Sequence, residues 1–120
     1  MTDHLTRRFN VPADALAYEI VQEQAAALGR LGRALEQALV RLRAFDAERA
    51  ASAIPASPAD KRRRHALLTE AGEALWLFVV QRESCGLRDS RTVMRDYKVP
   101  VEVEAPMGAF PSTVPPEDAQ

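Results

Sequence analysis

The chain has 120 residues, of which 47% are hydrophobic and 28% are charged, and its formal net charge is −1 at pH 7. These values are ordinary for one soluble globular domain or one subunit of a small assembly, and the near-neutral charge argues against a generally basic nucleic-acid binder. Cys85 is the only cysteine, so an intrachain disulfide is excluded. Neither a signal-peptide core nor an apolar run of roughly 20 residues is present, so we expect a soluble cytoplasmic protein that does not enter a membrane.

The first predicted element is one long amphipathic helix from Pro12 to about Ala50. Gly29 and Gly32 lie on one flank of it, and each glycine costs about 1 kcal/mol relative to alanine in a helix interior. We therefore expect Trp76, or a residue close to it, to fill the notch that the two glycines leave. The helix is predicted from mostly apolar residues at alternating steps of three and four, interrupted only by a glutamine: Val21, Gln24, Leu28, Leu31, Leu35, Ala38, Leu42 and Phe45.

A second helix is predicted after the breaker-rich stretch ASAIPASP. Ser57 can cap its N-terminus, Pro58 suits the first helical position, and Asp60 completes the capping pattern. The helix should end near Cys85, because Gly86 can adopt the left-handed conformation that stops a helix. A short connection between two long helices predicts an antiparallel hairpin.

A third, short helix is predicted from Asp89 or Ser90 to a point before Pro100, because the residue preceding a proline disfavours the helical region. The first helix is longer than the second, so its N-terminal third should overhang the hairpin. We expect the third helix to fold over this open end. The apolar residues that it would cover are Tyr18, Ile20 and Val21.

The segment Val99 to Gly108 is ambiguous, because its VEVE pattern fits an edge strand as well as a helical turn. We favour the helical turn. Residues 1–110 are interpreted as a single helical domain whose first ten residues are loose. Residues 111–120 are interpreted as a disordered, proline-rich acidic tail.

The predicted fold class is all-α: a long antiparallel helical hairpin plus a short C-terminal helix. A hairpin of two helices cannot bury all of its apolar residues by itself, because too few residues remain to cover its open face. We therefore expect a homodimer with coiled-coil-like packing, in which two hairpins form a four-helix bundle across a two-fold axis.

The densest charge in the chain is the run from Lys61 to His65 in the first turns of the second helix. It could bind nucleic-acid phosphate or an acidic partner. The simpler interpretation is a solvated face neutralised by Asp60 and, across the hairpin turn, by Asp46 and Glu48. We weight the solvated face more heavily, because no aromatic residues are interleaved with the charges.

A polar cluster is predicted at the overhanging end of the hairpin, where Gln24 and Arg82 interrupt the two apolar stripes at about the same level. A charge on an apolar stripe needs a partner, because an isolated buried charge is very costly. We favour a structural network in which Arg82 pairs with Glu19 or Glu23. The alternative is an anion or small-ligand pocket lined by Arg82, Arg88 and Arg91.

Enzymatic chemistry finds little support in the sequence. Cys85 lies at a helix end and is interpreted as a buried structural cysteine rather than a nucleophile. One cysteine and two scattered histidines offer no metal-ligand spacing. We expect no catalytic residue, no metal and no cofactor.

Two segments, YEIVQEQAAALGRLGRALEQAL (18–39) and LWLFVVQRESCGLRDSRTVMRDYKVP (75–100), together resemble a small family of bacterial helical proteins of unknown function. The resemblance covers most of the chain except both tails. It implies a helical fold and no activity, cofactor or catalytic residue.

The function that we expect is a dimerising interaction or regulatory module that binds another, unknown protein and is not an enzyme. One alternative is a nucleic-acid-associated regulator that uses Lys61–Arg64 and Arg82–Arg95. The segment around Gly86 is an imperfect helix-turn-helix for that purpose, with Arg82 where alanine is usual and Thr92 where an apolar residue is expected. The other alternative is a small-ligand or anion binder at the Arg82 cluster. The candidate interaction residues are Arg62, Arg63, Arg64, Arg82, Arg88, Arg91 and Arg95.

Overall fold

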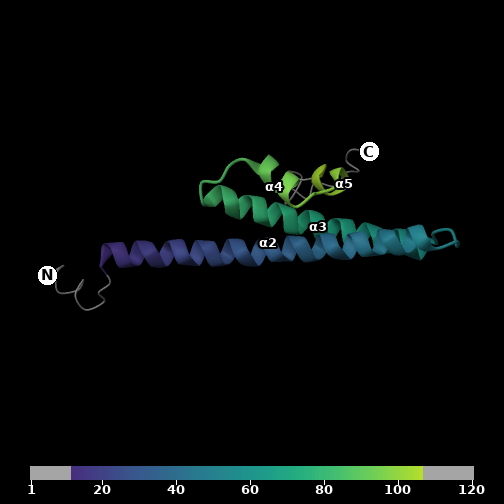
Figure 1. Ribbon diagram of the computed structural model, residues 1–120, viewed down its shortest axis with the longest axis horizontal. Helices are drawn as coiled ribbons and strands as arrows, with labels where there is room; N and C mark the ends of the chain where they lie inside the picture. The colour runs from purple at the N-terminus through teal and green to yellow at the C-terminus, as the bar shows by residue number, and fades with distance from the viewer. Residues whose placement is uncertain (1–11, 107–120) are drawn as a thin grey trace, which may run out of the picture.

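The computed structural model describes residues 12–106 of the chain. This part of the chain is all-helical, without a strand, and Figure 1 shows its elements: α2 (Ala13–Ala51), α3 (Pro58–Ser84), α4 (Ser90–Asp96) and α5 (Val101–Glu104). The predicted helices are confirmed, including the helical turn after Pro100. The predictions for the first ten residues and for the 111–120 tail lie outside the described residues.

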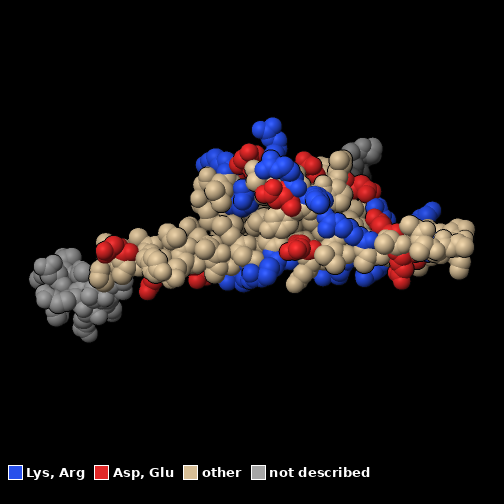
Figure 2. Space-filling view, viewed as in Figure 1, with Lys and Arg blue, Asp and Glu red and all other residues tan. Residues whose placement is uncertain are grey.

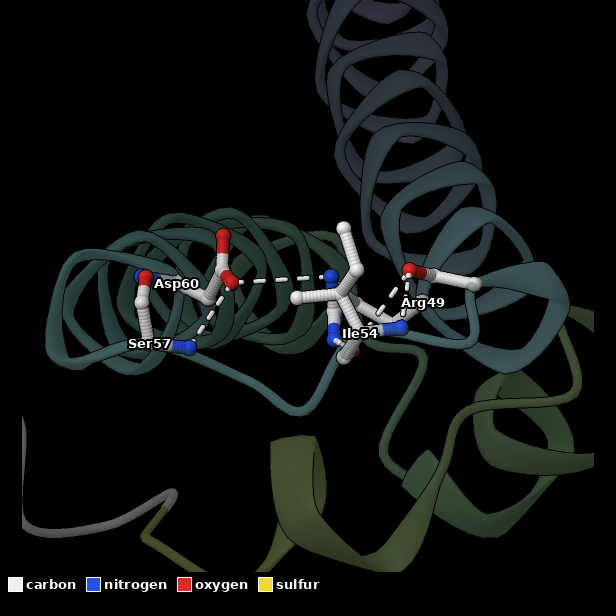
Figure 3. A network of polar contacts seen from close by, with 5 residues as sticks. Arg49, Ile54, Ser57 and Asp60 are labelled. Carbon is white, nitrogen blue, oxygen red and sulfur yellow. Dashed lines mark hydrogen bonds and ion pairs between the residues drawn. The ribbon is translucent and has the colours of Figure 1, made fainter.

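Helices α2 and α3 form the predicted antiparallel hairpin, and polar contacts hold its turn together. The Ser57 hydroxyl oxygen accepts a hydrogen bond from the Asp60 backbone N–H at 3.1 Å, and the Asp60 carboxylate accepts one from the Ser57 N–H at 2.9 Å. This reciprocal pair is the predicted capping box. Figure 3 shows that the Arg49 side chain lies between Asp60, 3.5 Å away, and the carbonyl oxygen of Ile54. The last turn of α2 is thus tied to the first turn of α3.

Helices α4 and α5 lie over the hairpin and complete its core, with Val93 and Val103 as their buried residues. The chain reaches them through Gly86, whose φ of +89° is the left-handed conformation predicted for the end of α3. The Leu87 N–H donates to the Arg82 carbonyl at 2.8 Å, which closes a Schellman motif. The buried apolar core is formed by Leu35, Ala38, Leu39, Leu42, Leu67, Ala71, Leu75, Phe78, Val79, Val93 and Val103.

The predicted notch exists at Gly32 but not at Gly29. A Cβ atom added to Gly32 would lie 2.8 Å from the Tyr97 hydroxyl oxygen and 3.4 Å from the Phe78 ring. Phe78, two residues from Trp76, is therefore the neighbour from α3, and Tyr97 is an unforeseen second one. The two rings pack edge to face with centroids 5.4 Å apart. A Cβ atom on Gly29 would meet only the side chain of Arg33 from the same helix.

The prediction that the third helix covers the overhang of α2 is wrong. After Gly86 the chain turns back over the hairpin, as Figure 1 shows, so that α4 leads away from the overhang. Arg43 of α2 holds the end of α4 by donating hydrogen bonds of 3.0 Å to the carbonyl oxygens of Tyr97 and Lys98. The physical reason is that α4 gains more contact against the aromatic pair at Gly32 than it could gain from a single uncovered helix.

Candidate interaction surface

The overhang of α2, which we define as residues 13–27, continues the apolar stripe of the hairpin without a cover. Val21, Leu28, Leu35 and Leu42 follow one another at intervals of seven residues and therefore share one face of the helix. Leu35 is 0% exposed and Val21 is 60% exposed. One continuous stripe is thus buried in the hairpin and open to solvent beyond it.

The overhang is nevertheless a regular helix, and its composition explains why. Six alanines lie between Ala13 and Ala27, and alanine has the highest intrinsic helix propensity. The first turn also carries Asp14, an acid at the positive end of the helix dipole. The side chains that this helix presents include large apolar ones, because Leu16 is 48% exposed and Ile20 is 52% exposed.

A shallow groove of about 210 Å³ runs along the hairpin between α2 and α3. It lies on the flank of α2 away from α4, because Arg43 and Leu39 on the other flank approach the end of α4. Arg41 of α2 and Glu70 of α3 form an ion pair across the groove. The apolar residues that line it are Leu31, Ala34 and Ala38 from α2 and Ala74 and Leu77 from α3.

Charge is distributed unevenly along α2. Between Ala13 and Gly29 the charged residues are all acidic, so this part of the helix carries −3. From Arg30 to Arg43 four arginines stand against one glutamate, so this part carries +3. Figure 2 agrees on the face that it shows: red and no blue on the overhang, and blue gathered beneath the middle of α2. The members are Asp14, Glu19 and Glu23 in the acidic part, and Arg30, Arg33, Glu36, Arg41 and Arg43 in the basic part.

Within the basic run of α3, Arg64 is half-buried and has a structural role. Its guanidinium donates to both oxygens of Asp46, at 2.8 and 3.0 Å, and to both oxygens of Glu102, at 2.9 Å each. These hydrogen bonds raise the pKa of Arg64 and hold the pKa values of Asp46 and Glu102 below their usual range. The contact with Asp46 confirms part of the predicted neutralisation. Glu102 was missed because it lies 38 residues away in the sequence.

The other members of the basic run are more exposed to solvent than Arg64. Arg62 and Arg63 are exposed on α3, as is Lys61. Asp60 was expected to neutralise the run, but it pairs with Arg49 instead. Its pKa is lowered chiefly by the hydrogen bond from the Ser57 backbone. A partner can therefore reach every member of the run except Arg64: Lys61, Arg62, Arg63 and His65.

Arg82 does not form the predicted ion pair with the overhang. Its guanidinium carbon lies 5.9 Å from the centroid of the Phe78 ring, and its Nη2 is 3.5 Å from the carbonyl oxygen of Asp89. Glu23 pairs instead with Arg30 of its own helix, at 3.9 Å. Arg82 thus supports the start of α4, because Asp89 is the N-cap of that helix.

The arginines after Gly86 are exposed and alternate with acids. Arg91 lies 3.7 Å from Asp89, and Arg95 lies 3.4 Å from Asp96. Arg88 is exposed in the connection between α3 and α4. Figure 2 shows the result, a mixed blue and red surface over α4. Neighbouring acids reduce the positive potential that this surface offers to an anion.

Residues 5–114 match the family described as "Family of unknown function (DUF6665)". The chain belongs to this family. No curated protein and no solved structure matches it. Membership agrees with the resemblance seen in the two quoted segments and carries no activity with it.

Within residues 12–106 of this DUF6665 chain, no group of three or more histidine, cysteine or acidic side chains could hold a metal ion. Cys85 is half-buried at the end of α3, where its Sγ atom accepts a long contact of 3.8 Å from the Gln81 amide. None of the helices in this part of the chain is long and apolar enough to cross a membrane.

Proposed function

We propose that this DUF6665 chain is a dimerising protein-interaction module. The observation that carries the proposal is the overhang, where the stripe that builds the hairpin core continues for about two heptads without a cover. Contiguous apolar surface of this kind marks protein–protein contact sites. Ile20 and Val21 are both more than half exposed there.

The shape of the molecule supports the same proposal. The radius of gyration is 20.4 Å and the longest dimension is 74 Å, whereas a compact domain of about 100 residues has a radius of gyration of about 13 Å. Helices α4 and α5 cover one side of the hairpin, and the groove lined by Leu31 and Leu77 remains open on the other. A helix of a second copy on that open side would bury the groove.

Protein is a better-supported partner than nucleic acid. A nucleic-acid site concentrates positive charge along the phosphate backbone, whereas acids stand beside Arg91 and Arg95 in this chain. A surface of alternating charges suits a protein partner whose own charges alternate. The residues that we assign to this second contact are Arg62, Arg63, Arg88, Arg91 and Arg95.

The test of the proposal combines two measurements on the full chain. Light scattering coupled to size-exclusion chromatography, repeated over a range of concentrations, should give twice the chain mass of 13.3 kDa. A pull-down from the native host, split into nuclease-treated and untreated halves, should recover a discrete protein in both halves. A monomeric mass at every concentration would exclude dimerisation, and a partner lost after nuclease treatment would favour the nucleic-acid alternative.

A further inference from the structure

We infer that two copies of the chain pack antiparallel through α2, so that the overhang of each copy lies in the groove of the other. This inference rests on the dimerisation proposed above and specifies its geometry. The overhang and the groove are the two uncovered apolar surfaces of the same helix pair, and one two-fold axis brings each onto the other.

The overhang is long enough to cover the groove. The overhang has 15 residues and spans about 22 Å at 1.5 Å per residue. The α2 residues that line the groove run from Leu31 to Arg41 and span about 16 Å, so the overhang can cover the whole groove. A two-fold axis near Gly29 therefore places one overhang along one groove at each end of the dimer.

Three apolar residues of the overhang lie on the same flank of α2 as the groove. Leu16, Ile20 and Ala27 are related to Leu31, Ala34 and Ala38 by sums of three- and four-residue steps. Pairing about Gly29 sets Ile20 opposite Ala38 of the second copy and Ala27 opposite Leu31. Each of these pairs sets one large side chain against one small one, which is how packed helices interdigitate.

The charges next to this flank decide the direction of pairing. Glu19, Glu23 and Arg30 follow each other at steps of four and seven residues, and the ion pair between Glu23 and Arg30 shows that they share one side of the helix. Arg33 lies three residues after Arg30 on that side. Antiparallel pairing brings the acids of each overhang to the arginines of the other copy. Parallel pairing would set acids against acids and arginines against arginines.

Two further charges bear on the groove. Glu70 and Glu73 of α3 line it, and Glu70 is already paired with Arg41. Both belong to α3. The ion pair with Arg41 reduces the repulsion between Glu70 and the acids of the overhang.

A charge-reversal experiment tests the direction of pairing. The Glu19→Lys, Glu23→Lys double variant should raise the dissociation constant of the dimer about tenfold or more, because like charges would then face each other. The Arg30→Glu, Arg33→Glu double variant should do the same. An equimolar mixture of the two variants should restore a dimer close to native affinity, because both ends of the mixed dimer are complementary.

The matched control for the Arg30→Glu, Arg33→Glu variant is the Arg88→Glu, Arg91→Glu variant, which makes the same net change of charge near α4 and should leave the dissociation constant within about twofold. Analytical ultracentrifugation measures the affinities, and circular dichroism confirms that each variant keeps its helices. Two weakened variants that fail to rescue each other would overturn the antiparallel geometry.

A distance measurement tests the geometry with all charges in place. In a Cys85→Ser background, one spin label at Ala15→Cys should lie about 40 Å from its copy in the dimer, because the labels are 14 residues from the axis on opposite sides. A label at Ala26→Cys, close to the axis, should lie within about 20 Å of its copy. A dimer with a short Ala15 distance would overturn this inference and leave the proposed dimerisation intact. A monomer would remove both.

Discussion

The two halves of α2 have the same pattern and opposite environments. Leu35 and Leu42 lie in the core of the hairpin at 0% and 2% exposure, whereas Val21, which occupies an equivalent heptad position, is 60% exposed. Helical periodicity is satisfied equally in both halves, since α2 is continuous from Ala13 to Ala51. An amphipathic pattern therefore predicts that one face of a helix packs against another surface. It does not predict which part of the molecule provides that surface.

The difference arises from the unequal lengths of the two long helices. α2 has 39 residues and α3 has 27, so α3 ends before it reaches the N-terminal part of α2. Helix α4 could have extended the cover and instead packs at Gly32, where Tyr97 and Phe78 meet. The half of α2 that lies in the hairpin is covered from two sides, and the overhang from none within the described chain.

The largest expected effect is the difference in the free energy of unfolding between Leu35→Ala and Val21→Ala. Leu35→Ala should lower the free energy of unfolding by about 2–5 kcal/mol, because it leaves a cavity in a packed core. Val21→Ala should change the free energy of unfolding of the monomer by no more than about 0.5 kcal/mol, because no other part of the described residues packs on this side chain. Guanidinium titrations at concentrations where the chain is monomeric measure both values. Equal losses would mean that the overhang is covered within one chain.

The two glycines of α2 make a second matched pair. Gly32→Ala should lower the free energy of unfolding by about 1–3 kcal/mol, because the new Cβ atom would displace Tyr97. Gly29→Ala should raise it by about 0.5–1 kcal/mol, because only the flexible Arg33 side chain lies nearby and alanine favours the helix. Thermal melts followed by circular dichroism measure both, and a stabilising Gly32→Ala would contradict the close packing.

The covered half also depends on Arg64, which joins α2, α3 and α5 through Asp46 and Glu102. Arg64→Met keeps most of the aliphatic stem and removes the hydrogen bonds. We expect a loss of about 1–2 kcal/mol, kept small because both acids are partly exposed to solvent. Arg62→Met, two residues earlier and exposed, is the control and should be neutral in the same denaturant titration.

The same contacts predict a pH dependence of the stability of the hairpin. Arg64 lowers the pKa values of Asp46 and Glu102 in the folded state, relative to about 3.9 and 4.3 in the unfolded chain. Their contribution to stability is therefore complete above about pH 5 and is lost as the pH falls through the folded pKa values. Unfolding free energies measured from pH 7 to pH 3 should fall less steeply in the Arg64→Met variant, and parallel curves would contradict the assignment.

The smallest effect is expected at Lys98, the residue after α4, which adopts a φ of 53°. The N–H groups of Lys98 and Val99 donate to the carbonyls of Arg95 and Met94 at 3.2 and 2.9 Å, which completes a Schellman motif. A lysine in this left-handed conformation costs about 1 kcal/mol relative to glycine. Lys98→Gly should raise the free energy of unfolding by up to about 1 kcal/mol, whereas Lys98→Ala should leave the free energy of unfolding nearly unchanged.

Much of the candidate surface could not be predicted from the sequence. The neutralisation of Arg64 by Asp46 follows from the hairpin turn, which brings together these two residues from positions 18 residues apart in the sequence. The second partner, Glu102, depends on where α5 comes to rest. Arg82 was placed on the apolar stripe correctly, yet its partner is the Phe78 ring and not an acid of the overhang. Long-range partners of this kind depend on the path of the chain after Gly86.

The sequence by itself determined the helices and their ends, because these depend on contacts within a few residues. The capping box of Ser57 and Asp60, the stop at Gly86 and the 3.6-residue period of α2 are all local. Only the tertiary structure decided that Tyr97 and Phe78 meet at Gly32 and that α4 leaves the overhang uncovered. Those outcomes depend on which of several apolar surfaces gives the closest packing, and a one-dimensional pattern does not contain that comparison.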